Sequence, residues 1–338
     1  MKWKHRRVVW IVGMAGWLVG LVGLVGLVGL VGLVGLMWSA LVQADIYRWV
    51  DDNGKVHFGD RPPASQPVET LDIDTRSEWK PFDIQVHYQE QLIMEQPIGL
   101  DAPRIQREVN YVYRFFDEVL YFDFYKQVPV TIHVLKDQRA YTRYLLRKTG
   151  SDYRNTAGMY LGKTHEIVVF LHPEKMGGLE STYRTIRHEV SHAILGALNT
   201  WPPVWLNEGL SEQMETLEMD GNRFVIRPHE QNRRHLLKTR ATAMPVLEFV
   251  EIRSSRWREH GNTYSNYAMA GQLVYRLLST TYGRSCLTRL LQDYKRGERL
   301  RAYYLLDKHY IGGAAAFRLH WEQWMKTDMS QPWQVVLQ

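Results

Sequence analysis

The chain has 338 residues, 45% of them hydrophobic and 23% charged, which is the balance of a globular protein with one large core or two modest ones. Its formal charge of +6 is misleading, because four basic residues and no acidic ones fall within residues 1–44. The rest of the chain has 38 basic and 36 acidic side chains and no basic stripe, so we expect no nucleic-acid partner. The single cysteine, Cys286, excludes an intrachain disulfide and a cysteine-based zinc site, and we interpret it as a buried structural thiol.

Residues 1–44 have the layout of an export signal. A basic stretch is followed by an uncharged run over residues 8–42, and Val42-Gln43-Ala44 provides the small residues of a cleavage site before Asp45. The run is longer than the roughly 7–15 residues of an ordinary signal peptide core, so an uncleaved membrane anchor is the alternative. In both cases the rest of the chain is exported, to the periplasm or anchored outside the inner membrane, and only residues 8–42 would contact the membrane.

Residues 45–63 predict a small β-hairpin module. Two alternating runs, Ile46–Val50 and Lys55–Phe58, flank an Asn53-Gly54 pair, which supplies the positive φ angles of a tight hairpin turn. The stretch resembles a small uncharacterised domain of exported bacterial proteins, marked by Tyr-Arg-Trp-Val-Asp, the glycine turn and a closing Asp-Arg-Pro-Pro. That resemblance implies an envelope location but no chemistry.

The polar, weakly patterned residues 64–96 are interpreted as a linker, with an added strand around Phe82–His87. From residue 97 to about residue 330 the pattern becomes that of one packed α+β domain. Its first expected elements are a helix over Ile105–Phe124, a strand over Val128–Leu135, a helix over Gln138–Arg147, and strands over Met159–Leu161 and Glu166–Leu171.

The next helix carries the first chemical motif. It is expected to begin near Leu179, with Ser181 or Thr182 as its cap, and it contains His188-Glu189-x-x-His192. Residues four apart share one helix face, so both imidazoles can reach one zinc ion. Glu189 follows the first ligand and is suited to take a proton from an activated water. The motif alone is also compatible with two histidines on a helix face without metal.

A second helix, expected after Pro202-Pro203, supplies a third ligand. Glu208 lies sixteen residues after His192 and completes a His₂Glu set that leaves a fourth position open, as in catalytic zinc sites. Gly209 would leave room beside the metal. Glu212, one turn further, could accept the free ring N–H of a ligand histidine, or it could be a solvated charge on the helix.

Together, His188-Glu189-x-x-His192 and Asn207-Glu208-Gly209-Leu210-Ser211-Glu212 resemble the gluzincin metallopeptidases of the peptidase MA superfamily. The resemblance covers roughly residues 100–300. It implies one zinc ion per chain held by His188, His192 and Glu208, with Glu189 as general base and with Glu212 and Asn207 supporting the ligands. It also implies an α+β zincin-like fold, in which a mixed sheet precedes the active-site helix and a mainly helical lobe follows it.

The same resemblance implies two further features. Gluzincins usually stabilise the oxyanion with a Tyr or His from the second lobe. Tyr267 is the first candidate and Tyr264 the second, both before an expected helix over Gln272–Ser279, while the weaker candidates are His229, His235 and His260. An edge strand should pair with the substrate, and the segment Glu166, Ile167, Val168 and Val169 is predicted for that role.

The sequence thus predicts an exported zinc metallopeptidase, favouring an endopeptidase, with a peptide or protein substrate. The Gly-x-Met-Glu-Asn signature of the aminopeptidase branch is absent. Two alternatives stay open: an enzyme with another amide substrate, such as a cell-wall peptide, and a noncatalytic envelope scaffold that retains the zinc fold. The presence of Glu189 argues against the scaffold, because metal binding alone needs no general base.

Overall fold

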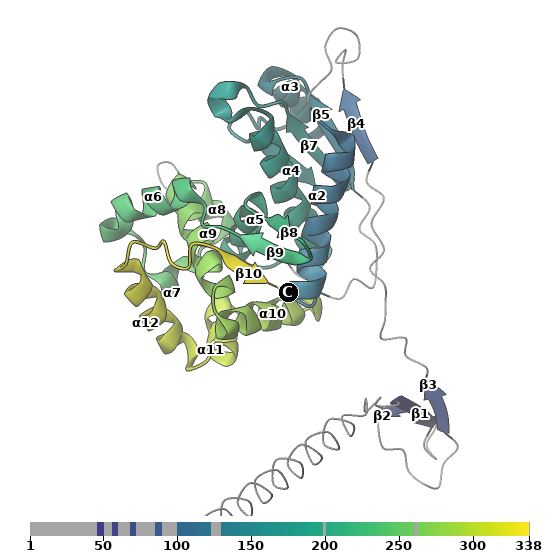
Figure 1. Ribbon diagram of the computed structural model, residues 1–338, viewed down its shortest axis with the longest axis vertical. Coiled ribbons are helices and arrows are strands. Elements are labelled where there is room, and N and C mark those ends of the chain that lie inside the picture. Colours follow the sequence, from purple (N-terminus) through teal and green to yellow (C-terminus); the bar gives the residue numbers. More distant parts are fainter. Residues whose placement is uncertain are drawn as a thin grey trace, which may run out of the picture. The chain divides into compact units, whose positions relative to one another are not determined.

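A computed structural model describes the strand residues 46–50, 56–59, 68–71 and 85–89, and then residues 100–122, 130–198, 201–259 and 263–337. The predicted export segment, residues 1–44, lies outside these described residues. Within them, no helix combines the length and the apolar character that crossing a membrane requires. The chain divides into two compact units, Met1–Glu78 and Trp79–Gln338 (Figure 1).

The first unit contains a three-stranded antiparallel sheet in the order β2-β1-β3. Strands β1 (Ile46–Val50) and β2 (Val56–Gly59) pair as the hairpin that the sequence predicts. Strand β3 (Val68–Leu71) pairs with the other edge of β1, so the interpretation of residues 64–96 as a linker is wrong at this point. A two-stranded hairpin is marginal alone, and a third strand gives the module a more stable sheet.

The second unit begins with a four-stranded mixed sheet in the order β4-β5-β7-β6. Strands β4 (Gln85–Gln89), β5 (Thr131–Leu135) and β7 (Glu166–Phe170) run parallel, whereas β6 (Gly158–Leu161) is antiparallel to β7. Strand β4 overlaps the strand expected around residues 82–87 and again lies inside the supposed linker. The linker prediction therefore missed β3, which belongs to the first unit, whereas β4, in the second unit, was expected as an added strand.

Helices bury both faces of this sheet. Along β7, Ile167 and Val169 belong to the main core, while the alternate residues Val168 and Phe170 belong to a smaller core with Tyr141. Such alternation is what the period of a strand requires when each face packs against a helix. Helix α2 (Ala102–Arg114), which continues as a π-helical turn (Phe115–Val119), and helix α4 (Gly178–Leu195) pack against the main core (Figure 1). Helix α3 (Gln138–Thr149) packs against the smaller core.

The predicted substrate edge strand is wrong. Strand β7, which contains Glu166–Val169, lies between β5 and β6, and its backbone groups pair on both sides. The edge position belongs to β6, the other strand of the same hairpin, whose residues Met159–Leu161 are only partly buried. Strand β7 is the more apolar of the two and takes the interior position in the sheet, where helices cover both of its faces.

The remainder of the second unit is mainly helical, which confirms the predicted α+β class with a mixed sheet first and a helical lobe second. Its helices are α5 (Val204–Glu215), α6 (Glu230–Thr239), α7 (Val246–Phe249), α8 (Ser254–Trp257), α9 (Thr263–Leu278), α10 (Thr281–Lys295), α11 (Ala302–His309) and α12 (Gly313–Met325). Short 3₁₀ turns occur at Glu174–Met176 and Arg240–Thr242. A small antiparallel sheet has the order β10-β9-β8 (Val335–Leu337, Arg223–Ile226, Glu218–Asp220).

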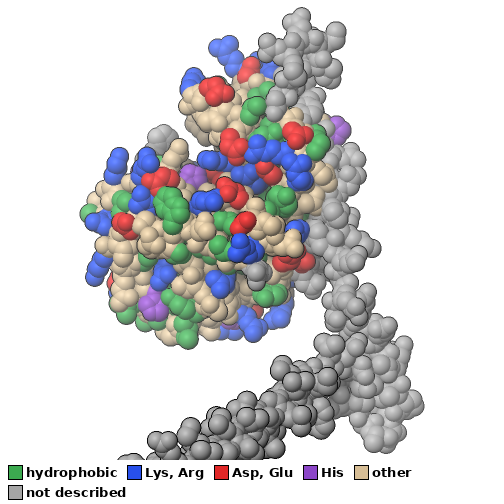
Figure 2. Space-filling view, viewed as in Figure 1, with side chains coloured by type: hydrophobic (Ala, Val, Ile, Leu, Met, Phe, Trp, Pro, Cys, Tyr) green, Lys and Arg blue, Asp and Glu red, His purple; other side chains and the backbone are tan. Residues whose placement is uncertain are grey.

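Cys286 is buried in α10, and burial raises the pKa of its thiol to about 12. On the face drawn in Figure 2, basic and acidic side chains occur together.

Helices α5 and α9 approach each other closely at Gly209. A Cβ atom built there would lie 2.5 Å from Val274 Cγ2 and 2.7 Å from the Ala270 carbonyl oxygen. The glycine therefore makes room for α9, and the expectation that it leaves space beside the metal is wrong. Helix α9 also starts at Thr263, so Tyr264 and Tyr267 lie inside it and do not precede it as expected.

Candidate metal centre

Helix α4 is fixed to the end of the sheet. It begins at Gly178 after the cap residue Gly177, and the φ angles of +60° and +91° at these two residues suit glycine. The helix therefore begins before both expected caps, Ser181 and Thr182. The buried Thr182 hydroxyl instead accepts the His172 backbone N–H at 3.0 Å and donates to the Phe170 carbonyl oxygen at 3.4 Å. The helix that carries the motif is thus anchored to the residues that end β7.

A buried arginine joins α4 to α5 and α2. Arg187 Nε donates to the Met214 carbonyl oxygen at 2.9 Å, and its Nη2 donates to the Glu215 carbonyl oxygen at 2.7 Å. Its third nitrogen pairs with Glu108 of α2. The guanidinium satisfies carbonyls at the end of α5 that have no partner within the helix, and it fixes the distance between α4 and α5.

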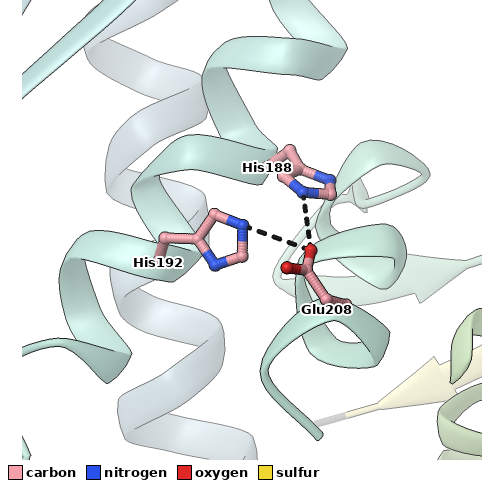
Figure 3. Close-up of side chains that lie close together, drawn as sticks. All are labelled: His188, His192 and Glu208. Atoms are coloured by element: carbon pink, nitrogen blue, oxygen red, sulfur yellow. Dashed lines mark ion pairs between the residues drawn. The ribbon is translucent and has the colours of Figure 1, made fainter. Parts of the chain in front are cut away.

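The three predicted ligands meet between these helices (Figure 3). His188 Nε2 lies 3.6 Å from Glu208 Oε2, and His192 Nε2 lies 3.4 Å from the same oxygen. The two rings are 4.9 Å apart at their centroids. Their ligand atoms lie close enough together that the three residues could hold one metal ion.

The outer nitrogens of both rings have acceptors. His188 Nδ1 lies 2.8 Å from Glu215 Oε1, while His192 Nδ1 lies 3.1 Å from Asn207 Oδ1 and 3.2 Å from Ser211 Oγ. The Ser211 hydroxyl donates to the Asn207 carbonyl oxygen, so its lone pairs are free to accept from the ring. Acceptors at both Nδ1 atoms favour the tautomer with Nδ1–H, which directs the Nε2 lone pairs inward.

The electrostatics of the cluster favour a positive charge at its centre. Burial lowers the pKa of His188, but the carboxylates of Glu208 and Glu215 outweigh burial and raise it overall. Burial raises the pKa of Glu208, but His192 and His188 outweigh it and lower the value. Glu208 Oε2 is buried without a hydrogen-bond partner. Protons on the rings or a metal cation would supply the missing charge.

Glu189 lies beside the ligands but faces the sheet edge. Its side chain is buried, and a backbone hydrogen bond from Tyr160 of β6 reaches its carboxylate. A Cβ atom on Gly158 would lie 3.0 Å from Glu189 Oε1, so glycine permits this close approach. Burial raises the pKa of Glu189, although the two histidines oppose that effect. A carboxyl whose pKa is raised in this way is a candidate general base.

Glu212, expected either to accept the free ring N–H of a ligand histidine or to be a solvated charge, is buried and is not the acid beside His188. Glu215, which the sequence reasoning missed, contacts His188 Nδ1, while its other oxygen lies 3.3 Å from His229 Nε2. Glu212 instead receives the Asn232 side-chain amide, and burial together with the neighbouring Glu215 raises its pKa to about 7. Glu215 follows Glu212 by three residues and so shares its helix face, which is the signal that could have identified it.

Of the two tyrosine candidates, Tyr267 lies nearer the ligands. Its ring packs edge-on against Trp257 at 5.5 Å, and burial and then the charge of Glu208 raise the pKa of its hydroxyl. Tyr264 is 48% exposed, and its ring lies 4.5 Å from that of His235. His235 itself contacts Ser265 Oγ at 2.8 Å. His260 lies outside the described residues.

Comparison with known proteins bears only on the first unit. Residues 36–80 match the family model of a domain of unknown function, DUF4124. A small uncharacterised domain was predicted here, and the match extends it beyond the expected residues 45–63. No peptidase family matches the chain, and no curated protein matches it. The metal centre therefore rests on its own geometry.

We expect the outer contacts to tune metal affinity. Glu215→Gln keeps the size of the side chain but removes the charge beside His188, so metal affinity should fall by roughly 10–100-fold. His192→Ala removes a ligand and should abolish stoichiometric binding. Glu248→Gln, an exposed site on α7, is the matched control. Metal analysis and titration against a chelator measure these effects, and full occupancy in His192→Ala would refute the ligand assignment.

Proposed function

We propose that the second unit is a zinc-dependent peptidase, favouring an endopeptidase, that acts on peptides or proteins outside the cytoplasm. The observation that carries the proposal is the convergence of two inward-facing Nε2 atoms and one buried carboxylate oxygen, with a separate buried carboxylate, Glu189, at the adjoining sheet edge. A purely structural cluster has no need of the second carboxylate.

The donor set and its spacing suit zinc. Two histidines and one glutamate are a known set of catalytic zinc ligands. With bonds of about 2.0–2.1 Å and tetrahedral angles, ligand atoms lie about 3.3 Å apart. The separations of 3.6 Å and 3.4 Å from Glu208 Oε2 agree with that value. The acceptors at both Nδ1 atoms supply the outer contacts that zinc-binding histidines usually have.

When bound, zinc supplies Lewis acidity that activates water and polarises a carbonyl group. Glu189 would take the proton from the attacking water and deliver it to the leaving amine, and its raised pKa suits both transfers. The Tyr267 hydroxyl would donate a hydrogen bond to the oxygen on which negative charge develops. Besides burial, the charges of Glu208 and Glu189 both raise the pKa of this hydroxyl, which supports a position of the hydroxyl near the reacting groups.

Strand β6 would hold the substrate backbone. Its outer edge has no partner strand in the sheet of the described residues, so its N–H and C=O groups can pair with an extended peptide. Gly158 and Tyr160 of β6 contact Glu189, so a peptide paired with this strand would present its scissile bond next to the base. Pairing along an edge requires no chain end, and this favours an endopeptidase.

Changing Glu189 to Gln tests the base. The substitution preserves size and leaves all three ligands in place, so zinc content and thermal stability should stay near wild type. The rate of peptide hydrolysis should fall by a factor of about 10² to 10⁴. Glu208→Gln, measured in parallel, should weaken zinc binding as well. Wild-type turnover by Glu189→Gln would refute the mechanism even if the metal site is correct.

Changing Tyr267 to Phe tests the oxyanion contact. Loss of one such donor typically costs about 10² to 10³ in kcat, and KM should change much less. Tyr264→Phe on the same helix is the matched control and should retain nearly full kcat, because its ring lies against His235. If the two variants have equal kcat values, Tyr267 does not have the proposed role.

Export is a proposal based on the sequence of residues 1–44. If the segment is a cleaved signal, sequencing the N-terminus of the mature protein should find Asp45. Finding residue 1 or 2 in the membrane fraction would show that the segment is an uncleaved anchor. Recovery of the full-length chain in the cytosol would contradict both forms of the proposal.

A further inference from the structure

A pocket of about 490 Å³ adjoins the metal centre on the Glu208 side. Its lining includes Asn207 and Glu208 of α5, residues of α8 and the residue after that helix. Trp201, which is 61% exposed, also lines it. A bound peptide that reaches the ligands can place a side chain in this space, so its lining bears on which substrates fit.

Trp201 of the pocket lining lies at the C-terminal end of α4, near Tyr160 of β6. A Cβ atom on Gly196, which ends α4, would lie 3.0 Å from the Trp201 indole and 3.2 Å from the Tyr160 ring. Trp201 and Tyr160 therefore meet over the same glycine, one turn after His192. A peptide paired with β6 would pass Tyr160 and Glu189 and then reach the mouth of the pocket.

The pocket wall carries a cation, Arg258, that has no counterion among the described residues. Arg258 is exposed on the pocket surface, and no hydrogen bond or ion pair joins it to another of the described side chains. Glu208 shares the pocket but is committed to His188 and His192. The hydroxyls of Ser254 and Ser255 line the same wall.

These groups match the chemistry of a carboxylate. A guanidinium binds carboxylates through two parallel N–H···O bonds, and nearby hydroxyls can donate further hydrogen bonds. An arginine paired with a protein acid would already have used that capacity, as Arg301 has with Glu251 at 2.8 Å. The negative charge of a substrate carboxylate would complement Arg258, which none of the described acidic side chains pairs with.

We propose that this pocket is a substrate subsite that selects a carboxylate close to the scissile bond, with Arg258 as the specificity-determining residue. The carboxylate can come from an Asp or Glu side chain or from the C-terminus of a short peptide. This inference rests on the proposed peptidase function, because it concerns which peptides the metal centre meets.

The test uses acetylated, amidated alanine-based heptapeptides that carry a single Glu or Gln at each position in turn. For wild-type protein, kcat/KM should favour Glu over Gln roughly tenfold at one position near the cleaved bond, as one charged hydrogen-bonded pair implies. Arg258→Gln should remove the preference for Glu over Gln, and Arg258→Glu should make Gln the preferred residue, because like charges then repel. The same peptides with a free C-terminal carboxylate show whether the selected charge comes from a side chain or from the C-terminus of the peptide.

Arg256→Gln is the matched control. Arg256 lies on α8, two residues before Arg258, and is also exposed, but it pairs with Glu259 and lines a different pocket. This variant should keep the wild-type preference for Glu. Calorimetry of the same peptides with the Glu189→Gln variant measures binding without turnover, so the preference can be read even if no peptide is cleaved.

The outcomes separate this inference from the function on which it rests. If peptides are cleaved but kcat/KM is the same for Glu and Gln at every position, the proposed subsite is refuted and the proposed peptidase function is not. If none is cleaved, the proposed function fails, and absence of a Glu preference in calorimetry also rejects the anion site. If Arg258→Gln slows Glu and Gln peptides equally, Arg258 acts on the reaction or the fold and does not select a carboxylate.

Discussion

The second unit is organised around the meeting of two imidazole nitrogens with one buried carboxylate oxygen, Glu208 Oε2. These atoms come from α4 and α5, so the contact exists only if both helices are held in register. Thr182 anchors α4 to the end of β7, and Arg187 ties α4 to the last carbonyls of α5. Gly209 lets α5 press against α9. The cost of bringing an unpartnered carboxylate into the interior is offset by positive charge at the centre of the cluster.

The mixed sheet contributes the other half of the site. Because β7 is apolar on both faces, it takes the interior position and leaves β6 at the edge, where Gly158 and Tyr160 reach Glu189. One helix thus presents His188 and His192 toward α5 and Glu189 toward β6. The two directions are possible because successive residues of a helix point about 100° apart, as His188 and Glu189 do.

Features of the site that depend on local sequence could be predicted better than features that depend on tertiary packing. His188 and His192 follow from helix spacing, and Glu208 was found through its motif, because these features need only neighbouring residues. Glu215 was missed because its contact with His188 depends on how α4 and α5 cross. The edge strand was misassigned because alternation identifies a strand but not its neighbours, and β3 was missed because a short strand in a polar segment has little periodicity of its own.

The central claim is that the His188, His192 and Glu208 cluster holds a metal that cleaves peptide bonds. The most direct test incubates the purified mature protein with a proteome-derived peptide library, with and without a chelator, and identifies new termini by mass spectrometry. The account predicts cleavage that the chelator abolishes and that added zinc restores. Cleavage that is insensitive to the chelator, or no cleavage by protein that carries one zinc ion per chain, would contradict it.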